Sequence, residues 1–498
     1  MRNLYTLFSG ILLLIIFAAG CKDKITEEPP AVDENNNGFA SYKVASIFAD
    51  NCAVSGCHKG PDAVHNLSLE SYSALMKGSL GRPFNDSTHT HTHKVNSTSA
   101  VDVYGGESVI PYNSEQSLLY NLITGNVADS TLRMPYQRAP LRSEDIQTIK
   151  EWIDNGAKDV NGNVPFSNPD HKVYSCNQGS DQVYVIDTDA KLVSRILDAD
   201  FNSTIIDAPH NVQMYGNYYY FTEVAGQKFI KVDEATNTIL GTVEGIEKAG
   251  MIQITPDGTK AFVSRSSTSA PIYNIIYSIN TDNMQIENQI SLPVTGVPHA
   301  LALSHDGRTL YVANMTKDRI SVVNAVNDEF VEDIVLQNTS PPPYYEPMHM
   351  YISPDDRYLY VNCRTSSSIL IVDTQTKLIV KEFPVPDHPM QGAISADGNK
   401  YYAVSHHEPY LSEITKSGND WTIQEYQVDA FQHAYGADLT PDGKYLYIGC
   451  SNDENEFQPY FQIPGKDRPS LMCIYDVQNH ELVKVMDIGS YATGMAAR

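Results

Sequence analysis

The chain has 498 residues, of which 60 are acidic and 35 basic, and its formal net charge is −25 at pH 7. A surface this acidic repels nucleic acids and anionic lipid headgroups, so we expect neither as a partner. An acidic surface favours binding of a cationic partner, or it serves only to keep the protein soluble.

The N-terminus has the pattern of an export signal. Arg2 precedes the apolar run 11–17, and the small residues 18–20 lead to Cys21. The run is too short for a stable membrane span. The ending Ala-Gly-Cys resembles the lipobox of bacterial lipoproteins, although an ordinary signal peptide with an unrelated cysteine would look similar. The resemblance implies cleavage before Cys21 and acylation of that cysteine.

The residues that follow bear on location. Lys22 rather than aspartate comes after the cysteine, which by the sorting rule of such lipoproteins implies the outer membrane. We therefore expect an exported protein, periplasmic or at the cell surface, with 1–20 as signal peptide. Residues 21–42 are polar and have little to bury, so we expect a flexible tether there.

Two cysteines and a histidine then come close together. Cys52 and Cys57 are separated by four residues, and His58 follows directly. In the usual C-x-x-C-H signature, two thiols form thioethers to a porphyrin and the histidine binds the iron. Here the loop is two residues longer, but the adjacent cysteine and histidine remain. The pattern predicts one covalent haem c; a disulfide loop or a zinc half-site would not explain the histidine.

Helical periodicity follows this motif. We expect helices over 67–76, over 114–123 with Ser114 as N-cap, and over 141–157 with a capping serine and a terminating glycine. A small all-α domain over 43–160 is the resulting prediction.

This run resembles the planctomycete-type cytochrome c domain, in which C-x-x-C-H precedes a leucine-rich turn, a Met-Pro loop and a closing helix ending in W-I-x-x-G-A. The resemblance covers residues 44–158 and departs from the family in the wider cysteine loop. In that family the Met-Pro methionine is the second axial ligand, which implies Met134 here. Met76 competes, but its apolar helical face favours a core position. Histidine and methionine ligation implies electron transfer rather than oxygen binding.

An insertion inside this domain carries three alternating histidines, His89, His91 and His93. In an extended strand they would share one face and chelate a metal. A solvated polar loop is the favoured interpretation.

From residue 160 onward, short β-branched and aromatic runs recur between turns. Clear copies of one unit lie at 298–324, 352–373 and 439–449, each with strand, Pro-Asp-Gly-type turn and strand. The period is roughly 45 residues, as in propeller blades. The second strands begin near Val173, Tyr218, Ala261, Leu310, Leu359, Tyr401 and Leu446.

We therefore expect an all-β, seven-bladed propeller over 165–498. The first unit lacks its leading strand, and residues 491–497 supply it to close the ring. The units resemble the YVTN family of seven-bladed propellers, with S-P-D-G, L-Y-V-A-N and I-x-V-I-D signatures. That resemblance identifies a fold but no function.

Four further cysteines lie in this region, namely Cys176, Cys363, Cys450 and Cys473. Export permits disulfides, but their spacing suggests no framework. We expect free, packed thiols.

Five histidines stand at the starts of leading strands: His210, His299, His349, His388 and His433. Leading strands line a propeller's channel, so these side chains are candidates to converge at one mouth. His406 and His407 follow a second strand and are expected near the other side of a blade. Nitrous oxide reductases and cytochrome-cd-type nitrite reductases resemble this arrangement, which implies a metal or second cofactor in the channel. The registers of the five differ, however, and favour a polar, hydrated channel.

Three functions remain open. The first is a lipid-anchored monohaem cytochrome that passes electrons to a redox partner protein, with the propeller as docking platform. The second is an oxidoreductase with its active site in the channel, and the third is a surface-binding propeller. We favour the first, with no catalytic residue of its own.

Overall fold

The computed structural model describes residues 36–81, 103–201, 206–269, 272–336, 344–465 and 468–498. The predicted signal and lipid site, and the three alternating histidines of the insertion, lie outside these residues. Among the described helices, none is both long enough and apolar enough to span a membrane.

A small helical module comes first and packs around one tryptophan. Its helical segments are α1 (Tyr42–Asn51), η2 (Val64–Asn66), α2 (Tyr72–Leu75), α3 (Leu118–Thr124), η3 (Ser130–Leu132) and α4 (Ser143–Asp154). Phe39 and Phe48 lie 5.7 and 6.1 Å from the ring of Trp152. The Tyr72 hydroxyl donates to the carbonyl of Ala157 at 3.0 Å. Phe39 is buried although it falls in the expected tether, so packing begins before α1.

The helices that the periodicity predicted are shorter in the structure. The helix expected over 114–123 begins only at Leu118, and Ser114 does not cap it. The chain turns first, and the Ser117 hydroxyl in the cap position donates to earlier carbonyls instead. At the start of α4, the N-cap position is occupied by Arg142 rather than by the expected serine. At α3, the local hydrogen bonds of the Ser117 side chain thus compete with the predicted helix start.

The helix expected over 67–76 is a single turn, α2. Ser71 caps it, because its side chain accepts a hydrogen bond from the backbone N–H of Ala74 at 3.2 Å. The residues before it form the short turn η2 and an extended segment. Isolated helices this short are marginal in water, so tertiary packing maintains this module.

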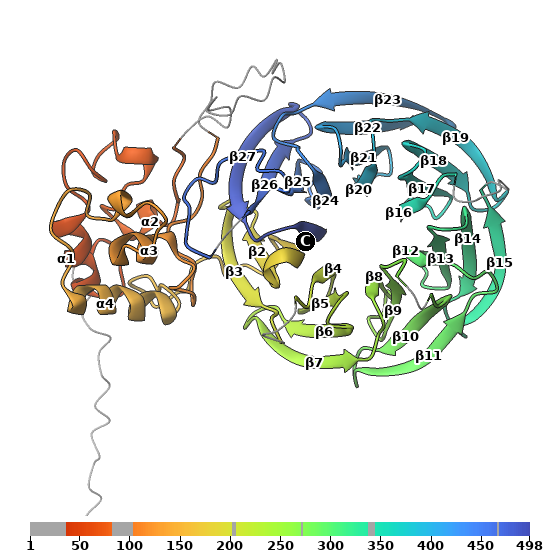
Figure 1. Cartoon of the computed structure of the whole chain (residues 1–498), viewed down its shortest axis with the longest axis horizontal. Helices are drawn as coiled ribbons and strands as arrows, with labels where there is room; N and C mark the ends of the chain where they lie inside the picture. The colour runs from red at the N-terminus through yellow and green to blue at the C-terminus, as the bar shows by residue number, and fades with distance from the viewer. Residues whose placement is uncertain (1–35, 82–102, 202–205, 270–271, 337–343, 466–467) are drawn as a thin grey trace, which may run out of the picture.

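The rest of the chain is a seven-bladed β-propeller. Its described strands form seven four-stranded antiparallel sheets arranged as a ring (Figure 1). The first four sheets in chain order contain β1 (Lys172–Asn177), β2 (Gln182–Asp187), β3 (Leu192–Asp198), β4 (Pro209–Tyr215), β5 (Tyr218–Glu223), β6 (Lys228–Asp233), β7 (Thr238–Glu244), β8 (Ala249–Ile254), β9 (Lys260–Arg265), β10 (Ile275–Asn280), β11 (Gln285–Ser291), β12 (Pro298–Leu303), β13 (Thr309–Asn314), β14 (Arg319–Asn324) and β15 (Glu329–Val335). The remaining strands are β16 (Pro347–Ile352), β17 (Tyr358–Cys363), β18 (Ser368–Asp373), β19 (Leu378–Pro384), β20 (Pro389–Ile394), β21 (Lys400–Ser405), β22 (Tyr410–Ser417), β23 (Asp420–Gln427), β24 (Ala434–Leu439), β25 (Tyr445–Cys450), β26 (Ser470–Asp476), β27 (Glu481–Ile488) and β28 (Ala492–Ala497).

The ring closes as the sequence predicted. β28 is the innermost strand of the first blade and pairs antiparallel with β1, with Val173 opposite Ala497 and Ser175 opposite Met495. The two ends of the propeller segment therefore share one sheet. Closure of this kind satisfies the backbone groups that a free edge strand would leave exposed.

The turn between the first two strands of a blade repeats one hydrogen bond. A serine or threonine hydroxyl donates to the aspartate two residues later, as from Thr255 to Asp257 and from Thr440 to Asp442, both at 2.6 Å. The glycine after that aspartate has a positive φ, +72° at Gly258, which glycine adopts without strain. The repeated sequence thus encodes the turn directly.

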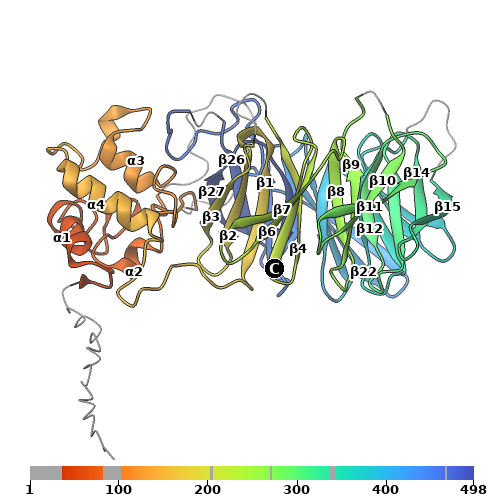
Figure 2. The same ribbon diagram turned by 90° about the horizontal axis from the view of Figure 1, so that it is seen from below.

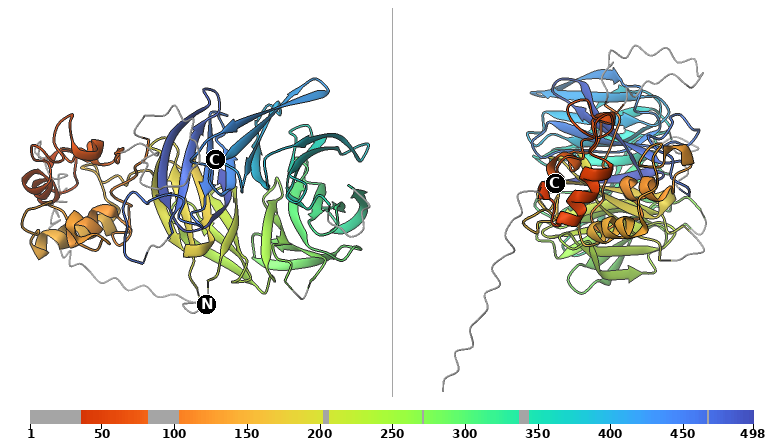
Figure 3. Two further views of the ribbon diagram at one scale, coloured as in Figure 1. Left: turned by 45° about the horizontal axis from the view of Figure 1, so that its top comes forward. Right: turned by 90° about the vertical axis from the view of Figure 1, so that its left-hand side faces the viewer.

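The helical module lies against the outer side of the ring, beside β3 and β27 (Figures 1 and 2). Tyr104 and Val485 form a parallel bridge, and the amides of Gly105 and Val485 donate to the carbonyls of Val485 and Val103 at 3.1 and 2.9 Å. Tyr104 is 2% exposed and belongs to the apolar core of the last blade. Figure 3 shows the module beside the disc in its left view and in front of the disc in its right view. The module therefore pairs one of its residues, Tyr104, with the outer strand of that blade.

Candidate functional site

The cysteine loop begins where α1 ends. The backbone N–H of Cys57 donates to the carbonyl of Val54 at 3.0 Å, and the backbone N–H of His58 donates to the carbonyl of Cys52 at 3.3 Å. Gly56, one of the added residues, has a φ of +80°. The longer C-x4-C-H loop therefore folds back on itself, and its turn holds His58 beside the carbonyl of the first cysteine.

The ring of His58 is oriented by a backbone carbonyl. Its Nδ1 lies 3.0 Å from the carbonyl oxygen of Leu67, so Nδ1 is the donor and Nε2 is the nitrogen suited to ligation. Burial is the main cause that lowers the pKa of His58 below its usual value. A neutral imidazole with a fixed tautomer is the form that binds a metal.

The two thiols of the loop are free and differ in exposure. Cys52 is 8% exposed, while Cys57 is half-buried. Burial chiefly raises the pKa of Cys52 to about 12, the nearby Arg138 lowers it, and Cys57 adds a smaller increase. Cys52 also belongs to the apolar core of the module.

Met134 follows η3 and packs against the same apolar core as Cys52. Its backbone N–H donates to the carbonyl of Leu122 at 2.9 Å, and this hydrogen bond holds the loop that contains Met134 against α3. Arg138, four residues later, donates to the carbonyl of Asn51 at 3.3 Å and so ties the methionine loop to the cysteine loop. Met76 also packs against this core, so burial alone does not separate the two methionines.

Apolar side chains next to both loops are exposed. Val64 is 42% exposed, and Leu132 and Tyr136, which flank Met134 in sequence, are 36% and 50% exposed. Exposed apolar side chains around converging polar groups are typical of ligand sites.

The channel histidines form two separate groups rather than one. His210, His299 and His349 lie on β4, β12 and β16 and are at most 3% exposed. Ring centroids are 6.0 Å apart between His210 and His299 and 5.8 Å apart between His299 and His349. Burial, the main cause, lowers the pKa of His210 to about 3 and that of His299 to about 4.

His388 and His433 belong to the second group, at the channel mouth. Both precede their strands and have positive φ values of +57° and +47°, whereas the inner three lie within strands. That difference in register explains why the five do not meet at one point. The sequence analysis expected His406 and His407 near the other side of a blade. In the structure they lie beside His388 instead, because the backbone N–H of His406 donates to the carbonyl of His388 at 2.9 Å.

Tyr435, which the sequence reasoning missed, separates the two groups. Its ring lies 5.9 Å from His349 and 6.2 Å from His406. It belongs to a buried cluster with Met315, Met348 and Met390. No single motif marks these residues, because they come from different blades and meet only at the axis.

The channel beyond this cluster is hollow and partly polar. A cavity of about 560 Å³ runs between the innermost strands, and its lining includes Asn211, Gln253, Gln391 and Asp438. Amide and carboxyl groups are suited to hold water. The lining is therefore partly polar, and the hydration of the channel stays a prediction.

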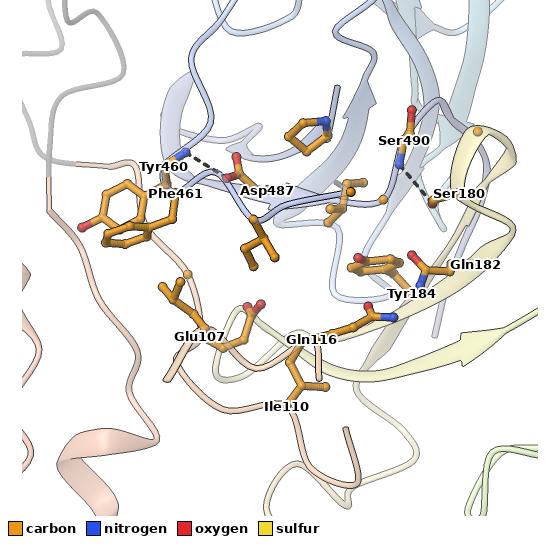
Figure 4. Close-up of a pocket in the computed structure, with 18 of the residues that line it drawn as sticks. Glu107, Ile110, Gln116, Ser180, Gln182, Tyr184, Tyr460, Phe461, Asp487 and Ser490 are labelled. Carbon is orange, nitrogen blue, oxygen red and sulfur yellow. Dashed lines mark hydrogen bonds between the residues drawn. The ribbon is translucent and has the colours of Figure 1, made fainter. Parts of the chain in front are cut away.

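A second cavity, of about 270 Å³, lies where the module meets the ring. Figure 4 shows Glu107 and Gln116 from the module opposite Tyr184 and Asp487 from the propeller. Burial, the main cause, raises the pKa of Glu107 to about 7, while Lys484 lowers it. The junction therefore encloses polar groups of both parts.

The propeller cysteines are buried free thiols, as predicted. Cys450 and Cys473 have sulfurs 3.9 Å apart. Burial raises the pKa of Cys176 and of Cys363 well above the usual value, so these thiols are unreactive packing groups.

Comparisons with known proteins agree on the propeller. The sequence model of the family described as "Lactonase, 7-bladed beta-propeller" matches residues 299–388. Antigen Lp49 of Leptospira interrogans is 27% identical over 206 residues, which are 36% of this chain and 43% of that protein. The match thus spans less than half of that relative.

The chain is also similar to solved structures. A functionally unknown protein from Desulfotomaculum acetoxidans has a TM-score of 0.52 at 12% identity, over 66% of this chain and 98% of that one. Hydrazine synthase of Kuenenia stuttgartiensis has a TM-score of 0.45 at 20% identity, over 57% of this chain and 80% of that one. At these identities the likeness concerns the fold alone.

Proposed function

We propose that this protein is an exported, lipid-anchored c-type cytochrome that carries electrons through one covalent haem, with the propeller as docking platform. Thioethers at Cys52 and Cys57, with His58 and Met134 as axial ligands, constitute the proposed site. The observation that carries it is the hydrogen bond from His58 Nδ1 to the carbonyl of Leu67 at 3.0 Å, beside two free thiols.

The residues present fit such a group. A carbonyl-anchored imidazole is the usual state of a metal-ligating histidine, and the second-coordination partner raises its basicity. When bound, the haem supplies a one-electron couple whose potential methionine ligation raises. Leu67 holds the imidazole, Arg138 ties the two loops together, and the apolar core excludes water from one side.

The docking platform follows from the junction. Backbone pairing between Val103, Gly105 and Val485 fixes the module on the last blade. A partner bound to the ring would therefore lie at a defined distance from the haem. The net charge of −25 favours a redox partner with a basic surface.

The proposed location rests on the N-terminal sequence. Acylation of Cys21 would hold the protein at the bacterial outer membrane, in the periplasm or at the cell surface. Replacing Cys21 with Ser should release the protein from membranes into the soluble fraction. Retention of that variant on membranes would contradict the lipid anchor.

The haem is tested by absorption spectroscopy of protein produced in a host that matures c-type cytochromes. We expect a c-type spectrum and haem that stays with the chain after denaturation. Cys57→Ser should weaken this covalent attachment, whereas Cys363→Ser, which changes a buried propeller thiol, should retain it. Absence of haem from the mature wild-type protein would overturn the proposal and leave a surface-binding propeller.

The axial ligand is tested by Met134→Ala, with Met76→Ala as the matched control in the same apolar core. Loss of the sulfur ligand should lower the reduction potential and open the sixth coordination position to added imidazole or cyanide. The control should keep the wild-type potential and spectrum. The reverse pattern would assign the ligand to Met76.

A further inference from the structure

We propose that the mouth of the propeller channel binds one divalent transition-metal ion, of the Cu²⁺ or Zn²⁺ class, through His388, His406 and His407. This site is distinct from the haem loop and lies in another part of the fold. It is assembled from the segment before β20 and the segment after β21, which are adjacent at the mouth.

One carboxylate holds two of the imidazoles. Asp387 accepts hydrogen bonds from Nδ1 of His388 at 2.9 Å and from Nδ1 of His407 at 3.0 Å. Ser367 donates a further hydrogen bond to the same carboxylate at 2.8 Å. Carboxylates that fix Nδ1 in this way are the usual second-coordination partners of metal-binding histidines.

The arrangement directs the other two ring nitrogens together. The rings of His388 and His407 are stacked, with centroids 3.9 Å apart and planes 30° apart. Because both Nδ1 atoms are held by Asp387, the two Nε2 atoms project side by side away from it. Asp387, His388 and His407 each offer one donor atom, and these three atoms lie within 4.8 Å of one another.

His406 supplies the third imidazole. Its ring lies 5.4 Å from that of His407, and its Nδ1 lies 3.3 Å from the carbonyl of Ala434. His433 is adjacent at 5.2 Å, but its Nε2 is paired with Glu456 at 3.1 Å. Three imidazole donors suit copper and zinc.

The surroundings admit and attract a cation. The side chains of His388 and His407 are 32% and 47% exposed, so an ion can reach them from solution. Asp453 and Glu456 lie beside His433 and add negative charge to the mouth.

Calorimetric titration of the chelator-treated, full-length protein with ZnCl₂ tests the site. We expect one tightly bound ion per chain. His388→Gln and His407→Gln should each weaken binding at least tenfold, and Asp387→Asn should weaken it roughly tenfold by releasing both rings. Electron paramagnetic resonance of the Cu²⁺ form should show one nitrogen ligand fewer in His406→Gln.

The matched control is His305→Gln. His305 also donates from Nδ1 to a carboxylate, Asp356, at 2.6 Å, but it has no described second imidazole stacked on it. This variant should bind Zn²⁺ like the wild type. Equal weakening in His305→Gln, or unchanged binding in both mouth variants with their far-ultraviolet circular dichroism preserved, would show adventitious surface chelation and overturn the proposal.

Discussion

The helical module and the propeller are stabilised in different ways. The propeller repeats a four-stranded sheet in which β28 and β1 close the ring, so each blade has a neighbour on both sides. The module has short helices and long loops around Trp152, and it pairs with the ring's edge through the single bridge between Tyr104 and Val485. The regular part therefore supplies rigidity, and the irregular loops place the candidate ligands.

The comparison also concerns where polar groups are buried. Within the propeller, His349 is buried without a described hydrogen-bond partner on either ring nitrogen. In the module, the buried polar groups Ser117 and Asn121 are satisfied by nearby carbonyls. The module is not free of such groups, however, because buried side-chain atoms of Asn36, Gln116 and Arg133 also have no described hydrogen-bond partner.

Breaking the junction should have the largest effect. Tyr104→Ala removes a buried ring from the core of the last blade and one hydrogen bond to Asp487, whose other oxygen still accepts from the backbone N–H of Tyr460. We expect a loss of roughly 3 to 5 kcal/mol in the free energy of unfolding. Calorimetry should show the module unfolding in a separate transition at lower temperature.

Tyr42→Ala is the control for that change, because Tyr42 is on the same module but 57% exposed. It should leave the transitions unaltered. A single transition at the wild-type temperature in Tyr104→Ala would mean that the junction contributes no stability.

The second prediction concerns the buried carboxyl of Glu223 in the propeller and the pH dependence of stability. Burial chiefly raises the pKa of Glu223 from 4.5 to about 8, although Lys228 lies 3.6 Å away and lowers it. Because the pKa is higher in the folded chain, the protonated carboxyl favours folding. Its contribution to the free energy of unfolding is fully present below pH 4.5 and is lost as the pH rises through 8. Glu223→Gln should therefore be more stable than the wild type by roughly 3 kcal/mol above pH 8.

Urea unfolding at pH 5 and pH 9 measures this difference. The advantage of Glu223→Gln should be small at the lower pH and full at the higher one. Glu244→Gln, which changes an exposed side chain on β7, is the control. An advantage independent of pH would assign the effect to packing instead of ionisation.

The smallest effect is expected in the cysteine loop. Gly56 has a φ of +80° and open space where a Cβ would lie, so Gly56→Ala strains only the backbone. A loss of roughly 1 kcal/mol is expected. It should appear as a lower midpoint of thermal unfolding of the full-length protein.

Gly106→Ala serves for comparison, since its Cβ would make an ordinary contact, 3.8 Å from Met486. It should cost less than the loop substitution. An equal cost at both positions would mean that the turn at Gly56 is not required.

The sequence by itself determined the propeller, because each blade repeats local signals. The predicted second strand at Leu310 begins at Thr309 in the structure, and the predicted closing run 491–497 became β28. Turn chemistry between residues two apart, such as Ser304 to Asp306, is encoded within one short segment. The motif at Cys52, Cys57 and His58 could be found from spacing for the same reason.

Only the tertiary structure decided how distant segments meet. The division of the channel histidines into two groups depends on whether each lies within a strand or ahead of it. The pairing of His388 with His407 through Asp387, and the contact of Tyr104 with the last blade, join residues from different segments. Such contacts are fixed by ring closure and docking geometry, which no local pattern of residues encodes.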